Sequence, residues 1–198
     1  MSPLILASAS TIRADLLRRA GVDFVVEPVR IDEAALRESL LADGATPHDI
    51  ADALAESKAR RSAVKNPHAR VLGFDQILDC GGTLYTKPTD LAQARAQLQA
   101  LGGQTHRLHT AVVLYDRGRP VWRHVATSLL TMRPLSDTYI DAYLARTWDQ
   151  IRHCVGCYQI EAEGVRLFSR IDGDLFAIQG VPLLEVLNVL TQRKELNG

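Results

Sequence analysis

The feature that most constrains the fold is a short apolar run, Leu4–Leu6, which passes through small hydroxylated residues into an amphipathic segment containing Arg13. This order predicts a buried strand followed directly by a helix. The first N–H groups of a helix lack partners within it and carry partial positive charge, so the junction suits an anion such as phosphate. The hydroxyls of Ser8 and Ser10 and the guanidinium of Arg13 would complete such a site. The alternative is that Ser10 is an ordinary N-cap and Arg13 an ordinary surface residue.

Composition narrows the class of protein without naming a function. The 198 residues are 46% hydrophobic, which is enough for a sizeable core, and we expect a single domain over residues 1–198. The 23 basic residues balance the 23 acidic ones, so we expect no general attraction to nucleic acid or to an anionic membrane. The N-terminal apolar run is too short for a signal peptide, and no later run is long enough to span a bilayer. We therefore expect a soluble, cytoplasmic protein with neither nucleic acid nor membrane as a partner.

Apolar periodicity and turn residues predict alternating strands and helices along the chain. After the first unit, strands are expected at Asp23–Val26, from Val71 to Gly73–Gln76, as two long strands over Gln104–Arg133, and at Tyr158–Ile160, Val165–Phe168 and Leu175–Ile178. Helices are expected over Asp32–Leu41, from Pro47 past Lys58, from a Thr89 cap to Leu101, from a Ser136 cap to Ala145, and from Pro182. Turns at Asp79–Gly82 and Asp116–Arg119 indicate antiparallel hairpins. The pattern favours an α/β fold with a mixed sheet.

The three cysteines do not form a disulfide framework. Cys154 and Cys157 have C-x-x-C spacing, but no second pair is present to complete a zinc site, and Cys80 lies in a Gly-rich turn. We interpret the pair as small residues in a tight turn of a reduced protein, with a redox pair as the alternative.

Several common catalytic motifs are absent from the sequence. It contains no G-x-x-x-x-G-K-[ST], which excludes a P-loop protein. No G-x-G-x-x-G follows a predicted strand, and there is no G-x-S-x-G nucleophile elbow.

Four charged residues are candidates for chemistry. Asp75 lies at the carboxyl end of a predicted buried strand, where a carboxylate can hold a divalent metal or orient a water; the alternative is a turn-forming residue. Lys58 on a predicted helix and Lys87, whose loop is directed by Pro88, are candidate cations, although each also fits a solvated surface position. Glu33 begins a predicted helix, where the dipole alone favours an acidic residue.

A series of short motifs runs along nearly the whole chain. They are Leu-Ala-Ser-x-Ser-x-x-Arg at residues 6–13 followed by Asp15, Leu16 and Leu17, then Ile31–Glu33, Ala55–Ala59, Val71–Gln76, Lys87-Pro88, Gly103–His106, Gly156–Glu161 with Gly164, and Gly180–Leu183. In this order and spacing they resemble the Maf family of nucleoside triphosphate pyrophosphatases. The resemblance implies the family's Maf/ITPase-like fold, an elongated mixed β-sheet flanked by helices.

The chain departs from the family pattern at two places. The family usually has Ser-Pro-Arg-Arg where this chain has Ser10-Thr11-Ile12-Arg13, so one of two common arginines is missing. Thr86 replaces the glycine that usually precedes Lys-Pro. We expect catalysis to be retained, because the chain keeps Ser8, Arg13, Lys58, Asp75 and Lys87.

The resemblance implies hydrolysis of the α–β phosphoanhydride of a nucleoside triphosphate to a monophosphate and pyrophosphate. Asp75 would orient or deprotonate the attacking water, and Mg²⁺ or Mn²⁺ would be held by Asp75 and Glu33. The substrate-binding groups would be Ser8, Ser10, Arg13, Lys58 and Lys87, because a triphosphate requires cations and aligned N–H groups.

Branches of the family differ at three positions, which fall here on Ile12, Gln76 and Glu161. Gln76 and Glu161 resemble the branch that acts on 7-methyl-GTP, and a glutamate can accept from the donor edge of guanine. Ile12 fits neither the tryptophan of that branch nor the arginine of the pyrimidine branch. We expect a general nucleotide pyrophosphatase, with 7-methyl-GTP selectivity as the alternative. Glu161 would have a purely structural role if it paired with a nearby arginine such as Arg166.

A competing hypothesis belongs to a different class of function. Maf-like proteins are linked to septum formation, so the chain would then be a regulatory binding protein that inhibits division. The intact catalytic set argues against a purely structural role. The family resemblance also implies a homodimer.

Overall fold

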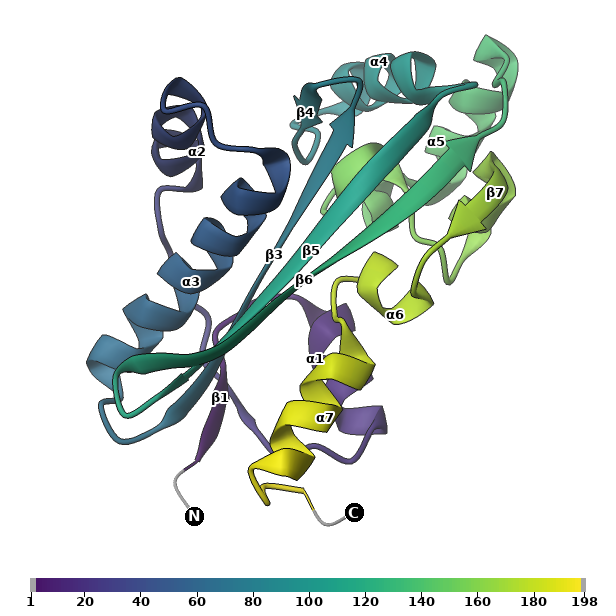
Figure 1. The fold of residues 1–198 in the computed structure, drawn as a ribbon. Coiled ribbons are helices and arrows are strands. Elements are labelled where there is room, and N and C mark those ends of the chain that lie inside the picture. Colours follow the sequence, from purple (N-terminus) through teal and green to yellow (C-terminus); the bar gives the residue numbers. More distant parts are fainter. Residues whose placement is uncertain (1–2, 197–198) are drawn as a thin grey trace. The chain divides into compact units, whose positions relative to one another are not determined.

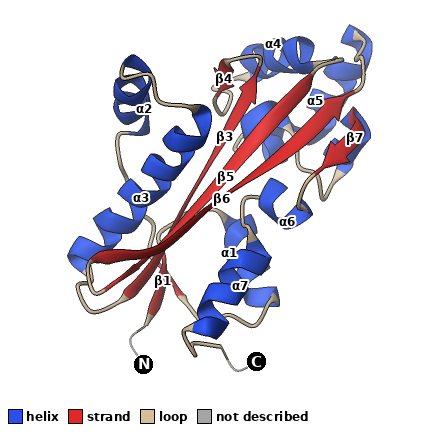
Figure 2. Cartoon of the chain, viewed as in Figure 1, coloured by secondary structure: helices blue, strands red, loops and turns tan. Residues whose placement is uncertain are grey.

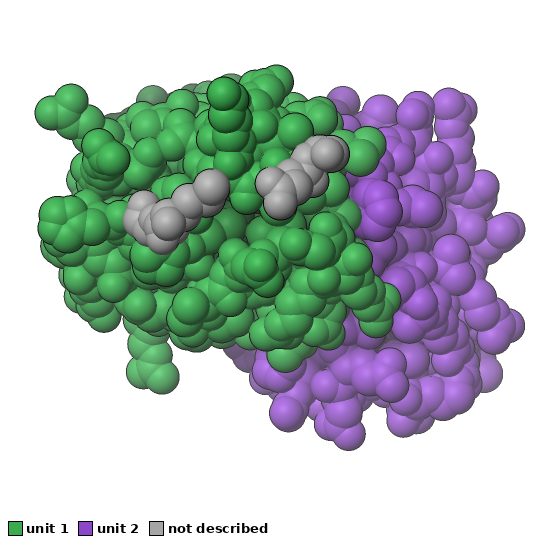
Figure 3. All heavy atoms as spheres, turned by 90° about the horizontal axis from the view of Figure 1, so that it is seen from below, with its two compact units in different colours: residues 1–76, 110–126, 180–198 green, residues 77–109, 127–179 purple. Residues whose placement is uncertain are grey.

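The computed structural model describes residues 3–196, which form two compact units. Of the described residues, unit 1 takes 3–76, 110–126 and 180–196, and unit 2 takes 77–109 and 127–179 (Figure 3). The predicted α/β class with a mixed sheet is confirmed. Within the described residues no helix is long and apolar enough to cross a membrane.

The sheet has the strand order β2-β1-β3-β5-β6-β7, with β4 paired to β3 (Figure 1). Strand β1 (Leu4–Leu6) pairs in parallel with both β2 (Val25–Val26) and β3 (Arg70–Cys80). Strand β4 (Thr83–Tyr85) is antiparallel to β3, and β7 (Phe168–Asp172) is antiparallel to β6 (Arg119–Met132). Strands β3, β5 (Thr105–Asp116) and β6 each contribute residues to both units.

In unit 1 the alternation of side chains along β3 sends neighbouring residues to opposite faces of the sheet. Leu72 and Phe74 pack in one apolar cluster with residues of helices α1 (Thr11–Arg19) and α7 (Leu183–Gln192). Gly73 and Asp75 face helix α3 (Pro47–Lys65), which covers the other side of the strand (Figure 2). Helix α2 (Glu33–Ala42) begins after the Asp32 cap and precedes α3. The alternation therefore places Asp75 on the α3 face.

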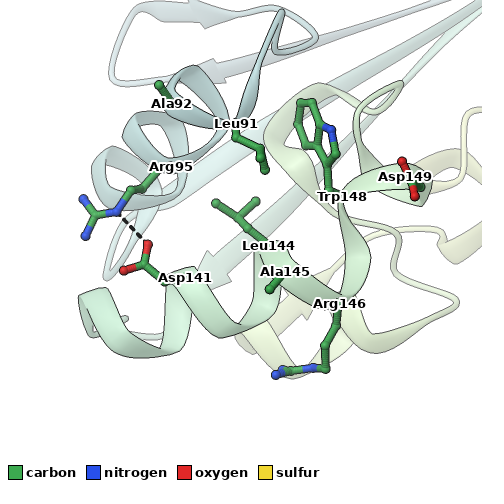
Figure 4. Close-up of a pocket in the computed structure, with 9 residues that line it drawn as sticks. All are labelled: Leu91, Ala92, Arg95, Asp141, Leu144, Ala145, Arg146, Trp148 and Asp149. Atoms are coloured by element: carbon green, nitrogen blue, oxygen red, sulfur yellow. Dashed lines mark hydrogen bonds and ion pairs between the residues drawn. The ribbon is translucent and has the colours of Figure 1, made fainter.

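Unit 2 has its own apolar core beneath helices α4 (Leu91–Leu101) and α5 (Asp137–Ile151). Two 3₁₀ segments, η1 (Val155–Cys157) and η2 (Glu163–Leu167), follow α5, and the short helix α6 (Leu175–Ile178) follows β7. A cavity of about 500 Å³ between α4 and α5 is lined by residues that include Leu144, Trp148 and the ion pair of Arg95 with Asp141 (Figure 4).

Most predicted elements are confirmed, and the differences have local causes. Strand β3 does not end at Asp75–Gln76 but continues to Cys80, because the buried Ile77 and Leu78 extend its apolar run. The hairpin turn is therefore confined to Gly81 and Gly82, which both adopt positive φ. Helix α4 is capped by Asp90 rather than by Thr89, since the Asp90 carboxylate accepts from Gln93 N at 2.8 Å.

The predictions were least accurate near the C-terminus. Helix α5 extends beyond Ala145 to Ile151 because Thr147 and Ile151 continue its buried face. Tyr158–Ile160 is not a strand, and Val165–Leu167 lies in η2, so β7 begins only at Phe168. The predicted strand at Leu175–Ile178 is helix α6, because the Asp174 carboxylate accepts from Phe176 N and Ala177 N.

His106 of β5 gives the folded state a pH dependence. Its ring is fully buried, Nε2 lies 2.8 Å from Tyr158 Oη, and burial lowers the pKa of His106 from 6.5 to about 4. Because the unfolded chain binds a proton more readily, the His106 contribution to stability is complete above pH 6.5 and is lost as pH falls towards 4. We expect His106 to lower the free energy of unfolding by about 2 kcal/mol between pH 7.5 and 5.

Urea unfolding of the wild type and of His106→Gln at both pH values checks this expectation. The glutamine does not titrate, so the variant should lose about 2 kcal/mol less than the wild type over the same interval. Equal losses in the two proteins would contradict the assignment.

Candidate active site

The loop between β1 and α1 forms a polar junction in unit 1. Ser10 is the N-cap of α1, and its hydroxyl accepts from Arg13 N at 3.3 Å. Ser8 is buried, and its hydroxyl accepts from Ser10 N at 3.2 Å and from Arg13 Nη1 at 3.3 Å. Ser10 is thus an N-cap, as the simpler interpretation expected, whereas a hydrogen bond joins Ser8 of the loop to Arg13 in the first turn of α1.

Arg13 is anchored rather than free on the surface. Its Nε donates to Gly180 O at 3.0 Å, Nη1 lies 3.4 Å from Phe74 O, and the guanidinium carbon lies 5.7 Å from the centre of the Phe74 ring. Burial lowers the pKa of Arg13, and the charges of Asp75 and Glu33 oppose that shift. Gly180 has φ +103°, and a Cβ there would lie 3.0 Å from Arg13 Nε. A glycine at 180 therefore permits the close approach of the guanidinium.

Lys58 of α3 joins two carboxylates in unit 1. Its Nζ lies 2.6 Å from Asp75 Oδ1 and 2.8 Å from Glu33 Oε1. The side chains of Lys58 and Asp75 are 12% and 8% exposed, whereas that of Glu33 is 47% exposed. The cluster is therefore buried at Asp75 on β3 and accessible to solvent at Glu33, the first residue of α2.

The burial of Asp75 affects its acidity. Loss of solvent raises the pKa of Asp75, and the Lys58 ammonium opposes the shift. A carboxylate with a raised pKa is a stronger base than an exposed one, so Asp75 is suited to take a proton from water.

Gln76 and Ile12 are the two predicted specificity residues of unit 1: Gln76 follows Asp75 in the sequence, and Ile12 precedes Arg13. Gln76 Nε2 donates to Thr110 Oγ1 of β5 at 2.8 Å, which fixes the amide on the face opposite Asp75. Ile12 is partly buried against the apolar cluster of unit 1.

Lys87 and Glu161 belong to unit 2, and both side chains are exposed. Both charges act on the thiol of Cys154: Glu161 raises its pKa and Lys87 lowers it, although burial is the largest cause of its raised pKa. Arg166 forms an ion pair with Glu163, with Arg166 Nη1 3.8 Å from Glu163 Oε1. Lys87 and Glu161 thus share the neighbourhood of Cys154.

Sequence reasoning missed several groups that hold these residues in place. They are the main-chain carbonyls of Phe74 and Gly180, the hydroxyl of Thr110, and the amide of Gln97. Phe74 and Gly180 carried a signal, since each lies in one of the short motifs, whereas Thr110 and Gln97 did not. The cavity between α4 and α5 contains none of the predicted site residues (Figure 4).

Comparison with known proteins identifies the family. A family model described as "Maf-like protein" matches residues 3–193. The chain belongs to the Maf family. This Maf protein is 55% identical over 191 residues to a nucleoside triphosphate pyrophosphatase of Ruegeria pomeroyi, with 96% of each chain covered. It is 54% identical to a protein of the same name from Roseobacter denitrificans, with 98% of each chain covered. It is also 45% identical to a 7-methyl-GTP pyrophosphatase of Brucella abortus, again with 98% of each chain covered.

The carboxylates of this Maf protein fit a divalent metal. Asp75 Oδ1 and Glu33 Oε1 lie 2.6 and 2.8 Å from the Lys58 ammonium, so one side-chain cation holds the two carboxylates close together. Mg²⁺ is commonly held by one or two carboxylates together with phosphate oxygens of the substrate. Within residues 3–196 no group of three or more His, Cys, Asp or Glu side chains is placed to hold a metal. A site that uses two carboxylates and the substrate is consistent with this arrangement.

Proposed function

We propose that this Maf protein hydrolyses the α–β phosphoanhydride of nucleoside triphosphates, releasing a monophosphate and pyrophosphate. The observation that carries the proposal is the buried carboxylate of Asp75, which lies 2.6 Å from Lys58 Nζ. Asp75 directly follows Phe74 on β3, and the carbonyl of Phe74 contacts the Arg13 guanidinium. The names of the relatives from Ruegeria pomeroyi and Roseobacter denitrificans support the same reaction.

The residues of unit 1 have different roles in this reaction. Asp75 takes the proton of the attacking water, and its raised pKa suits that role. Lys58 holds Asp75 in place and adds positive charge near the bond that breaks. The N-terminus of α1, with Ser8, Ser10 and Arg13 around it, binds phosphate oxygens through N–H and hydroxyl groups. We propose that Lys87 of unit 2 supplies a further cation for the triphosphate.

We also propose that Asp75 and Glu33 hold Mg²⁺ or Mn²⁺. When bound, the metal would act as a Lewis acid that neutralises negative charge as it develops on the triphosphate in the transition state. Lys58 then keeps the two carboxylates oriented towards one another, because it contacts both.

A pyrophosphate-release assay on a panel of canonical and modified triphosphates tests the proposal. We expect pyrophosphate and the nucleoside monophosphate in equal amounts. Release of inorganic phosphate instead would show cleavage at another bond. Nucleotide binding without any hydrolysis would favour the regulatory function in septum formation.

The phosphate-binding cations should act together. We expect Arg13→Ala, Lys58→Ala and Lys87→Ala each to lower turnover, with double variants losing less than the product of the single losses. Arg13→Ala should also lower stability, because it leaves the Gly180 carbonyl without its side-chain donor. Lys194→Ala, near the C-terminus, is the control and should retain wild-type turnover. Equal small losses at all four positions would indicate general surface electrostatics instead.

Selectivity for 7-methyl-GTP is the second candidate function. Glu161 is exposed, and Arg166 lies 3.8 Å from Glu163, which supports Glu161 as an acceptor for a guanine base rather than as the partner of Arg166. The relative from Brucella abortus carries the name 7-methyl-GTP pyrophosphatase. We propose Ile12, Gln76 and Glu161 as the specificity residues, with selectivity for 7-methyl-GTP as the alternative to a general nucleotide pyrophosphatase.

Steady-state constants for GTP, 7-methyl-GTP, UTP and dTTP test this selectivity. Glu161→Gln should weaken guanine substrates relative to pyrimidines by about tenfold, because it removes a charged acceptor. Ile12→Trp should raise relative activity on 7-methyl-GTP, since an indole ring can stack on the cationic base. Unchanged substrate ratios in both variants would mean that neither residue determines which base is preferred.

We further propose that residues 1–198 act as one pyrophosphatase domain, as a homodimer in the cytoplasm. A single family model spans residues 3–193, which supports one functional domain. All three cysteines are free thiols, which supports a reducing compartment. Sedimentation equilibrium on the purified chain tests the dimer, and a mass of one chain would contradict it.

A further inference from the structure

The buried amide of Gln97 connects helix α4 to the loop that carries Lys87. Gln97 is 7% exposed, and its Nε2 donates to the carbonyl of Thr86 at 2.9 Å. Thr86 directly precedes Lys87, and the buried Pro88 follows it. The Thr86 carbonyl is thus fixed from inside unit 2, immediately before an exposed lysine.

The other end of the Gln97 amide is also occupied. The thiol of Cys157 donates to Gln97 Oε1 at 3.3 Å. Cys157 is fully buried, and burial raises the pKa of its thiol to about 12, so the thiol keeps its proton at neutral pH and remains a donor. An amide with both ends bonded has one orientation, so Gln97 holds the Thr86 carbonyl in one direction.

Cys157 itself has an unusual backbone. It adopts φ +60°, which is uncommon for a residue with a side chain, and it follows Gly156 at φ +77°. The hydroxyl of the buried Tyr143 donates to the carbonyl of Cys157 at 3.1 Å and helps to hold this conformation. Such strained residues concentrate at functional sites, where the surrounding structure maintains them.

We propose that Gln97 is a positioning residue that sets the direction of Lys87 for substrate binding, with Cys157 fixing the orientation of its amide. The side chains of Gln97 and Cys157 act through the Thr86 carbonyl, and neither needs to touch the substrate. Pro88 limits the freedom of the chain on the other side of Lys87. The inference rests on the proposed function, since it requires Lys87 to bind the triphosphate.

A double-mutant cycle between Gln97 and Lys87 tests the proposal. Gln97→Met keeps the shape of the side chain and removes both hydrogen bonds. We expect it to lower kcat/KM for a triphosphate about three- to tenfold in the wild-type background. In the Lys87→Ala background the same substitution should change kcat/KM less than twofold, because the group that it positions is gone. Gln99→Met is the matched control: Gln99 lies on the same helix, and its exposed amide donates to Asp137 at 2.8 Å.

The possible outcomes separate this proposal from the proposed function. An equal loss from Gln97→Met in both backgrounds would indicate a general packing defect and would overturn the positioning role. Activity of Gln97→Met equal to that of Gln99→Met would overturn it as well. If Lys87→Ala alone kept wild-type kcat/KM, the substrate role of Lys87 would fail first and this inference would fail with it. Thermal unfolding of each variant verifies that the compared proteins are folded.

Discussion

Asp75→Asn is expected to lower turnover of nucleoside triphosphates by about 10²–10⁴-fold while leaving the protein folded. Asparagine has the shape of aspartate but cannot take a proton from water or carry the charge that a metal requires. The fold should survive because Lys58 still pairs with Glu33 at 2.8 Å. Pyrophosphate release measured beside thermal unfolding checks both parts of the expectation. A variant that kept more than about a tenth of wild-type turnover would remove Asp75 from catalysis.

Asp79→Asn is a matched control for this experiment. Asp79 lies on the same strand, is 6% exposed, and its Oδ1 accepts from Gly82 N at 2.9 Å. An asparagine oxygen can accept the same bond, so the turn after β3 should persist. We expect the turnover of the Asp79→Asn variant to stay within a few-fold of that of the wild type. A large loss from Asp79→Asn would mean that any buried carboxylate on β3 is needed, and would weaken the specific role of Asp75.

The sequence predicted those parts of the fold that depend on neighbouring residues. Ser10 caps α1 and Ser136 caps α5 because each hydroxyl accepts a bond from a backbone N–H three residues later. The start of α3 was predicted from Pro47 alone, and the structure adds a capping box of Thr46 and Asp49 around it. These signals are contained in a few residues, so they can be read without the rest of the chain.

Other parts depend on residues far apart in the sequence. Arg13 donates to Gly180 O across 167 positions, and no local pattern indicates that pairing. Asp75 was expected at the end of a strand, whereas it lies inside β3, where its charge is balanced by Lys58 from α3. The short motifs correctly indicated the family, but the contacts that hold the candidate site together follow from the packing of helices on the sheet.

Gly73 determines how closely α3 packs against β3. A Cβ at this position would lie 2.3 Å from Ala55 O, 2.6 Å from Ala59 N and 2.8 Å from Ala59 Cβ. The nearest atoms belong to the backbone of α3, so a side chain at 73 must push the helix away from the strand. Lys58 lies on that stretch of helix, and Asp75 lies two residues along the strand. Replacing Gly73 with a residue that has a Cβ should therefore move Lys58 Nζ away from the Asp75 carboxylate.

We expect Gly73→Ala to lower the free energy of unfolding by about 3 kcal/mol and turnover by about 100-fold, since a misplacement near 1 Å can have that effect on catalysis. Adding Ala59→Gly should restore little, because the carbonyl of Ala55 and the amide of Ala59 remain in the way. Gly102→Ala is the control: its nearest atom, Leu98 O, would lie 3.3 Å from the new Cβ. Urea unfolding and pyrophosphate release on the same samples measure both effects. Full recovery with Ala59→Gly would show that the clash involves only the Ala59 methyl group, and that α3 keeps its place on the strand.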